Sequence, residues 1–268
     1  MPFGKMPPVV KNLLIINVLM LFLTYVFQSS LGINLTKILG LYFWESELFE
    51  PYQYVTHMFM HGGVAHLFFN MFALWMFGRV LETVWGSKRF FYYFMFTGIG
   101  AAFFHTLVGW WEFHRVNEAA TAFYNTPSPE AFSAFIQEHF PQYYNKIYDS
   151  LLVKWQEAPN QQAYVDQARS YINQLLTLQV NIPTVGASGA VFGILLAFGM
   201  LFPNTQLMLL FPPIPIKAKY FVIGYGLIEL YAGVANRSGD NVAHFAHLGG
   251  IIFGFILIKY WQKKGSAF

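Results

Sequence analysis

Cysteine is absent from this 268-residue sequence, and charged residues are scarce. Without cysteine the chain forms no disulfide, no thiolate metal site and no thiol nucleophile. Asp, Glu, Lys and Arg make up only 11% of the residues, whereas they make up about a quarter of a soluble domain. Hydrophobic residues reach 56% and the mean hydropathy is +0.41. This composition indicates a membrane protein; its expected surroundings are the lipid bilayer and other membrane proteins, and no nucleic acid is expected.

Six stretches are candidates for membrane spans, since a spanning helix needs about 20 mainly apolar residues. They are residues 13–27, 66–84, 90–111, 185–202, 220–235 and 242–261. The first stretch is longer than the apolar part of a usual signal peptide and is followed by no clean cleavage site, so we expect it to be retained. The predicted fold class is an all-α polytopic membrane protein with six transmembrane helices.

Lysine and arginine are distributed unevenly between the two membrane faces. With six spans, both termini lie on the same face of the membrane. That face carries ten Lys and Arg and one acid, and the opposite face carries six Lys and Arg and eleven acids. This bias predicts cytoplasmic termini. Because the outer face lacks cysteine and the first span lacks a cleaved signal, the expected location is a bacterial inner (cell) membrane. The outward turn then lies near residues 236–241.

The segment 112–184 departs from the membrane-like composition. It follows the third span, and after Ser128 and Pro129, which suit the start of a helix, apolar residues recur at helical spacing. We expect an outward-facing insertion of two or three amphipathic helices, which either only caps the bundle or gathers substrate or contacts lipid. The expected division is a membrane core of spans 1–3 with the first outer loop (1–111), this insertion (112–184), and a membrane core of spans 4–6 with the C-terminus (185–268).

Polar side chains inside spans are costly and therefore mark function. Counted from the cytoplasmic ends of their spans, Ser188, His247 and Asn70 all lie about 21–22 Å up at a helical rise of roughly 1.5 Å per residue. His66 lies one turn higher than Asn70. In a hydrocarbon core about 30 Å thick, three helices thus bring polar groups to one level in the outer half of the membrane.

Acyl transfer is the chemistry that these residue types can perform. A serine hydroxyl needs a base that takes its proton, and a neutral histidine suits that role, so Ser188 is the candidate nucleophile and His247 the candidate base. His66 and Asn70 share one helix face and could donate to an oxyanion. A site in the outer half of the membrane would open outward to admit water.

Glycines surround the candidate serine. Gly186 and Gly189 would let a substrate backbone approach. Gly250 and Gly254 form a GxxxG pattern on the last span, which would bring the fourth and sixth spans close together. The alternative is that GxSG consists only of small residues at a helix interface, because such residues are common where membrane helices pack.

A metal site is a second alternative, because five histidines could be ligands: His57, His61, His66, His244 and His247. A metal-dependent membrane oxidoreductase would then contain stoichiometric iron or zinc. No HExxH motif is present, and the histidines fall on the outer side, so no metal or other cofactor is expected.

Other polar residues near the outer ends of spans have structural interpretations. His57 and His61 are expected to be loop residues that position the second span. His105 and Glu229 are expected to form hydrogen bonds within the bundle. The alternative for Glu229 is a role in gating, since the fifth span is the candidate gate for substrate. His244 lies one turn above His247, nearer to water, and is interpreted as its neighbour.

Four segments, in this order, closely resemble the rhomboid family of intramembrane serine proteases. They are HGGVAHLFFN (61–70), GRVLETVWG (78–86), GASGAVFG (186–193) and AHFAHLGGIIFG (243–254). The resemblance extends from about residue 49 to 254, without the insertion, and implies a rhomboid-like six-helix bundle.

The resemblance also implies roles for individual residues. Ser188 would be the nucleophile and His247 the base, as a dyad with no carboxylate. His66 and Asn70 would assist the oxyanion, and Glu82, within GxxxExxxG, would be the family's structural glutamate. The implied substrates are single-pass transmembrane proteins cut near the outer end of their helix.

The sequence departs from the family pattern at two places. Phe192 stands four residues after the serine, where many rhomboids have a tyrosine, so the ring that stacks on the histidine remains and the hydroxyl is lost. In the first loop, Tyr52 and Gln53 stand where many relatives have Trp-Arg. A catalytically inactive relative that binds transmembrane helices, as a chaperone or trafficking factor, is the non-enzymatic alternative. The sequence does not indicate an oligomeric state.

Overall fold

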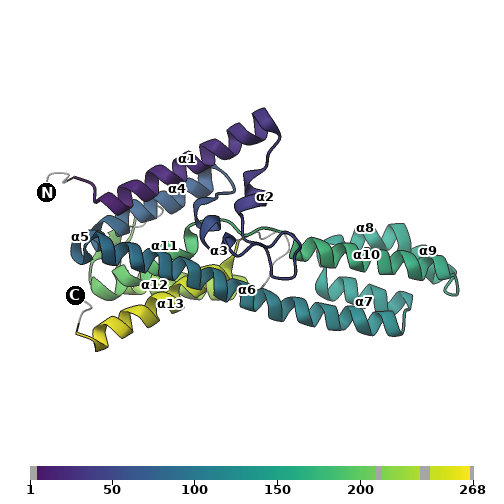
Figure 1. Ribbon diagram of the computed structural model, residues 1–268. Helices are drawn as coiled ribbons and strands as arrows, with labels where there is room; N and C mark the ends of the chain where they lie inside the picture. The colour runs from purple at the N-terminus through teal and green to yellow at the C-terminus, as the bar shows by residue number, and fades with distance from the viewer. Residues whose placement is uncertain (1–4, 209–212, 236–241, 266–268) are drawn as a thin grey trace.

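The protein is a helical bundle with a helical extension at one end, as the computed structural model shows (Figure 1). The structure describes residues 5–208, 213–235 and 242–265, so the predicted outward turn at 236–241 lies outside the described residues. Four helical stretches are long and apolar enough to cross a membrane: α1 (Pro8–Leu31), Val64–Trp85, α6 (Ser87–Asn125) and α13 (His244–Lys263). The chain is therefore an all-α membrane bundle; the count of six spans stays a prediction.

The other elements are shorter. Val64–Trp85 consists of α4 (Val64–Ala73), the π-helical turn η2 (Leu74–Gly78) and α5 (Arg79–Trp85). The remaining membrane-region elements are α11 (Ser188–Leu201), β1 (Gln206–Met208), β2 (Pro215–Lys217), which pairs antiparallel with β1, and α12 (Ala218–Ala235). The first loop contains α2 (Leu35–Leu39), α3 (Gln53–Thr56) and η1 (His57–Phe59). The helical extension is called the outer extension because it corresponds to the insertion that the sequence predicts to face outward. It contains α7 (Pro129–His139), η3 (Pro141–Tyr143), α8 (Tyr144–Ile147), η4 (Tyr148–Leu152), α9 (Val153–Glu157) and α10 (Gln162–Val180).

Helix α11 is short and central. Its 14 residues extend about 21 Å at the helical rise, which is less than the hydrocarbon thickness of about 30 Å. Ten of them are buried, because α6, α12, α13 and η2 pack around the helix. A helix that is shielded from lipid in this way does not have to span the bilayer. Its first residue, Ser188, lies among the surrounding helices.

Glycines allow α11 and α13 to touch. A side chain at Gly250 would collide with the backbone carbonyl of Gly189, and a side chain at Gly254 would meet the Tyr93 hydroxyl and the backbone of Gly193. The Tyr93 hydroxyl donates a 2.8 Å hydrogen bond to the Gly193 carbonyl. This close approach of backbones is what small residues permit in membrane helix packing, and it sets the distance between the two helices that carry Ser188 and His247.

Glu82 joins three helices at the opposite end of α11. Its carboxylate, 2% exposed, accepts hydrogen bonds from the backbone N–H groups of Val9 (2.9 Å) and Val10 (2.8 Å) at the start of α1. It also accepts one from the Ser87 hydroxyl at the start of α6 (2.7 Å). The first N–H groups of a helix have no partner within the helix and favour negative charge, so this buried acid holds α1 and α6 to α5.

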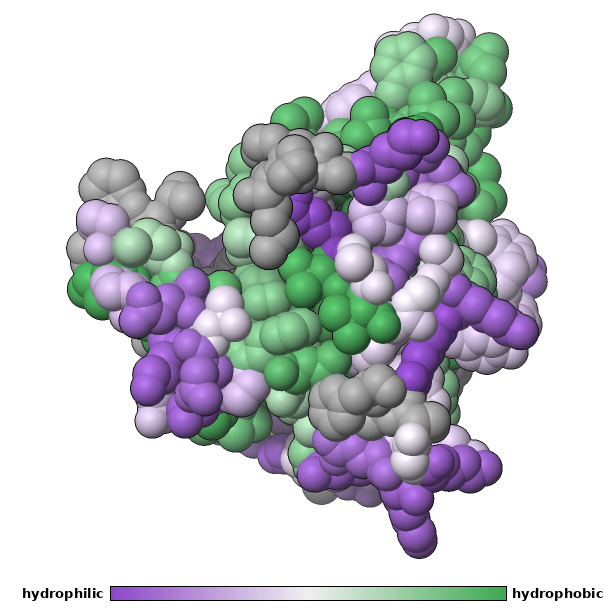
Figure 2. Space-filling view, turned by 90° about the vertical axis from the view of Figure 1, so that its left-hand side faces the viewer, coloured by the Kyte–Doolittle hydropathy of each residue, from purple (hydrophilic) through white to green (hydrophobic). Residues whose placement is uncertain are grey.

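The outer extension has a hydrophobic core of its own. Trp155, Phe132 and Phe123 are buried in it together with residues from the last turns of α6 and from α7 to α10. Helix α6 continues without interruption to Asn125, well past the predicted end of the third span at residue 111. The extension lies at the end of the bundle opposite to the start of α1 and the end of α13 (Figure 1). On the face of the bundle that carries the start of α1 and the end of α13, hydrophobic residues occupy the centre, and hydrophilic residues gather mainly along the lower and lateral edges (Figure 2).

Candidate active site

Ser188 is the first residue of α11, and a strained glycine turn leads into it. Gly186 has φ +125°, a conformation that residues with a side chain rarely adopt, and a Cβ at this position would lie 2.8 Å from Nε2 of His66. The Gly186 N–H donates to the carbonyl of His57 at 2.9 Å. The turn therefore requires glycine both for its backbone and for the space beside the serine.

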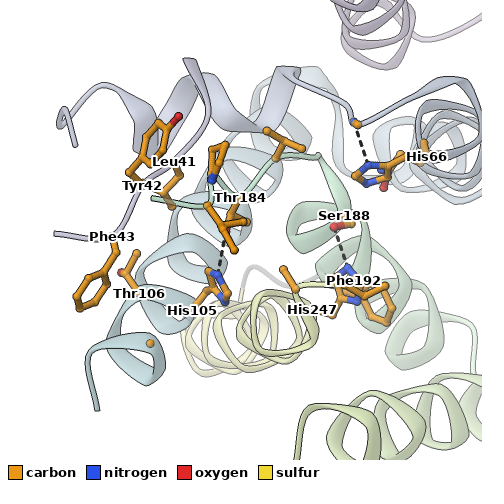
Figure 3. Close-up of a pocket in the computed structure, with 18 of the residues that line it drawn as sticks. Leu41, Tyr42, Phe43, His66, His105, Thr106, Thr184, Ser188, Phe192 and His247 are labelled. Carbon is orange, nitrogen blue, oxygen red and sulfur yellow. Dashed lines mark hydrogen bonds between the residues drawn. The ribbon is translucent and has the colours of Figure 1, made fainter. Parts of the chain in front are cut away.

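His247 is hydrogen-bonded to Ser188. Its Nε2 lies 2.8 Å from the Ser188 Oγ, which is within the distance at which a base takes a proton. Phe192, one turn along α11, stacks on the imidazole with ring centroids 4.2 Å apart and planes 11° apart (Figure 3). The stacking predicted for this phenylalanine is present without the hydroxyl of a tyrosine.

Glu229 contacts the other side of the same imidazole. Its Oε2 lies 2.8 Å from Nδ1 of His247 and 2.6 Å from Nδ1 of His244. Glu229 and His247 are both buried, at 5% and 8% exposure. The dyad expectation included no carboxylate, whereas the structure has one on the far nitrogen of the histidine.

His66 and Asn70 lie on the facing side of the serine. Nδ1 of His66 accepts a long hydrogen bond, 3.4 Å, from the Gly62 N–H, so in a neutral ring the proton is on Nε2, the nitrogen beside Gly186. Asn70, 4% exposed, donates its amide to the His66 carbonyl at 3.2 Å. Both side chains line the same cavity as Ser188, and both carry N–H donors.

His57 and His61 support this arrangement from the first outer loop. Burial lowers the pKa of each to about 4, so both are neutral at pH 7. Neutral His57 donates Nδ1–H to the Gln53 carbonyl at 2.9 Å, and its own carbonyl receives the Gly186 N–H. The His61 ring stands edge-on to His66, with centroids 5.1 Å apart. The loop thus orients the glycine turn and His66.

A cavity of about 840 Å³ opens beside the serine. Ser188, His247, His66 and Asn70 line one part of it. The rest is lined by residues of α6, of the last turn of α10 and of the segment that follows α10, among them Glu112, Gln179, Ile182 and Thr184. Figure 3 shows Thr184 and His105 in this wall. Thr184 is held by a 2.9 Å hydrogen bond to Nε2 of His105 and by backbone pairing with Leu41. A pocket of this size is of the kind that holds a substrate segment.

The five histidines considered as alternative metal ligands do not come together as one group in the described part of the chain. Among the described residues, the side chains of Glu229, His244 and His247 lie close enough together to share an ion. His57, His61 and His66 do not belong to this group. The contacts of Glu229 with both rings are 2.6 and 2.8 Å long, which are hydrogen-bond lengths.

Comparison with known proteins assigns the chain to a family. The family model described as the Rhomboid domain matches residues 48–110 and 163–263. These residues make up more than half of the chain, and the chain belongs to the rhomboid family. The unmatched segment between them covers the end of α6 and the helices α7 to α9. Membership of this family supports an intramembrane protease-like function.

One protein to which this chain is similar is "Rhomboid protein 1, mitochondrial" of Saccharomyces cerevisiae (strain ATCC 204508 / S288c). It is 27% identical over 210 residues, which are 77% of this chain and 42% of that protein. The chain thus spans less than half of this relative's length.

Glu229 as the partner of His247 was missed from the sequence. The signal was present, because Glu229 lies six residues from the outer end of α12, or about 9 Å at the helical rise. This is the depth below the outer surface already assigned to Ser188 and His247. The same count along the fifth span therefore gives Glu229 the level of Ser188 and His247, whereas its apolar neighbours in sequence indicate only a hydrogen bond within the bundle.

Proposed function

We propose that this protein is an intramembrane serine endopeptidase that cleaves single-pass transmembrane proteins near the outer face of the membrane. The observation that supports it most is the 2.8 Å hydrogen bond between Ser188 Oγ and His247 Nε2. A half-buried serine hydroxyl that is hydrogen-bonded to a histidine has the partner that it needs to become a nucleophile.

The proposed reaction proceeds in two halves. Ser188 Oγ attacks the scissile carbonyl while His247 Nε2 takes its proton, and the carbonyl oxygen becomes an oxyanion. When the tetrahedral intermediate collapses, the C–N bond breaks and His247 gives the proton to the leaving amine. A water molecule, deprotonated by His247, then attacks the acyl-enzyme, and Ser188 leaves with the proton restored.

Donors for the oxyanion surround the serine. Helix α11 begins at Ser188, so its first backbone N–H groups and its positive dipole end are directed toward the reacting carbonyl. The Nε2–H of His66 and the amide of Asn70 would add side-chain donors from the opposite wall. The substrate helix has to unwind locally, because a hydrogen-bonded helix hides its carbonyls from a nucleophile.

The membrane setting is part of the proposal. The charge bias favours cytoplasmic termini in a bacterial inner membrane, and the site would then open outward toward the helices of the extension. Residues 1–111 and 185–268 would form the catalytic membrane core, with 112–184 as an outer insertion. Fusing a reporter that is active only in the cytoplasm to the C-terminus tests this orientation.

The activated serine is tested by labelling the detergent-purified protein with a fluorophosphonate probe. Labelling is expected for the wild type and for Ser170→Ala, an exposed serine of α10 that serves as the matched control. It is expected to disappear in Ser188→Ala and His247→Ala. A folded wild type that never labels, or equal labelling of Ser188→Ala, would refute the protease and favour the inactive helix-binding alternative.

A further inference from the structure

Glu229 is a carboxylate in the middle of an apolar helix. It is 5% exposed and lies in the sequence YFVIGYGLIELYAGVA of α12. An acid at this depth of a membrane is costly unless other groups compensate its charge. In this bundle the compensating groups are two imidazoles of the neighbouring helix, His244 and His247.

The hydrogen bond to Nδ1 decides which nitrogen of His247 holds the proton. An ionised carboxylate only accepts hydrogen bonds, so the proton of the contact between Glu229 and His247 belongs to Nδ1. A neutral imidazole has one N–H. Nε2 is therefore left with its lone pair, and it is Nε2 that lies 2.8 Å from the Ser188 hydroxyl.

We propose that Glu229 is the positioning residue of a Ser188–His247–Glu229 triad, holding the imidazole in the tautomer and orientation that accept the serine proton. This inference rests on the proposed protease function. The three groups come from three helices, α11, α13 and α12. Two hydrogen bonds join them in the order hydroxyl, Nε2 and Nδ1 of the imidazole, carboxylate. Triads of this geometry recur on unrelated folds and are recognised by geometry, not by sequence position.

The carboxylate has a second effect after proton transfer. When His247 has taken the proton of Ser188, it is an imidazolium in surroundings of low dielectric constant. A negative charge 2.8 Å from its Nδ1 stabilises that cation far more than it would in water. The pair therefore favours the charged state of the base that forms as the nucleophile attacks.

His244 fixes the carboxylate itself. It lies one turn before His247 on α13, and its Nδ1 is 2.6 Å from the same Oε2. Together with the stacked Phe192 ring, these contacts restrain the imidazole of His247 from three directions: the serine, the carboxylate and the ring face.

Replacing Glu229 by glutamine tests the role, since it keeps the size and removes the charge. The amide can turn its NH₂ toward Nδ1, which forces the proton onto Nε2 and leaves no acceptor for the serine. We expect kcat to fall by about 100-fold or more, because the analogous change in a serine protease triad costs about 10⁴-fold. KM should stay within about twofold, since Glu229 does not contact the substrate.

Ser170→Ala, at an exposed position of α10, is the control and should keep the kcat of the wild type. His244→Ala removes the other ring on Oε2 and leaves the bond between Glu229 and His247. Its kcat is expected to fall far less than that of Glu229→Gln. If Glu229→Gln folds and turns over within about threefold of the wild type, or if its loss lies in KM with kcat unchanged, Glu229 does not position the base.

The tautomer can also be measured directly in the wild type, which avoids the question of folding. In ¹⁵N-histidine-labelled protein in detergent, with the His247 signals assigned by their absence in His247→Ala, Nδ1 should be the protonated nitrogen. A proton on Nε2 would overturn the triad. A wild type that binds no fluorophosphonate would refute the protease itself, whereas an active wild type with an Nε2–H tautomer would refute only the role of Glu229.

Discussion

Phe192 shows at the scale of a single residue how a departure from the family pattern is accommodated. The ring lies 4.2 Å from the His247 ring, almost parallel to it, and 4.9 Å from the ring of Tyr225. A flat face against the imidazole restricts its rotation without any hydroxyl. The stacking was implied by the resemblance to the rhomboid family, in which many members have a stacked tyrosine four residues after the serine.

Removing this ring should reduce the rate without abolishing it. An aromatic pair contributes about 0.5–1.5 kcal/mol beyond its buried area, so Phe192→Leu is expected to lower kcat roughly two- to tenfold. Phe192→Tyr keeps the ring and should retain kcat within about threefold. Cleavage rates of one fluorogenic substrate with the three proteins decide the point; a Phe192→Leu variant as fast as the wild type would show that stacking does not orient the base.

The residues of the site differ in how far the sequence predicted them. Depth counted along each helix predicted that Ser188, His247 and Asn70 lie at one level. It could not predict which side of His247 faces an acid, because helix rotation depends on packing that a single sequence does not show. The contact of Glu229 with Nδ1 therefore required the structure.

At the scale of helices, the ends of elements were harder to predict than their existence. The predicted spans correspond to α1, the continuous helix Val64–Trp85, α6, α11, α12 and α13. Helix α6 nevertheless continues to Asn125, because residues of its last turns pack into the core of the outer extension. An apolar pattern marks where lipid ends, but a helix continues wherever another core covers it.

Glu82 carries the prediction that belongs to this scale, because it joins α1 and α6 to α5. The two carboxylate oxygens of Glu82 each accept a backbone N–H, one from Val9 and one from Val10. Glu82→Gln replaces one of these oxygens by an NH₂ group, so one of the two N–H groups loses its acceptor. Leaving a buried donor unpaired costs about 1–3 kcal/mol. The variant should therefore unfold at lower temperature in detergent, while its kcat at low temperature stays near that of the wild type.

Thr83→Ala is the control for that experiment. Thr83 is exposed and bonds only to the Arg79 carbonyl of its own helix, so its loss should leave the unfolding temperature unchanged. A Glu82→Gln variant as stable as this control would show that α1 does not depend on the buried acid.

At the scale of the whole molecule, the candidate site lies inside a helical bundle, beside a cavity of about 840 Å³. The short helix α11 begins within the protein at Ser188. The cavity lies beside this serine, and its wall includes the segment after α10. Composition was sufficient to predict a membrane protein, and spacing predicted amphipathic outer helices. Neither could predict that the extension and the membrane core meet at the cavity.

Proteolysis inside the bilayer is the central claim, and it is tested most directly with purified protein and a single-pass transmembrane substrate reconstituted together in liposomes. Mass spectrometry of the products should show one main cut in the outer third of the substrate helix. The cut should be absent with Ser188→Ala and present with Ser170→Ala. Products that persist with Ser188→Ala, or a folded wild type that leaves a series of such substrates intact, would contradict the account.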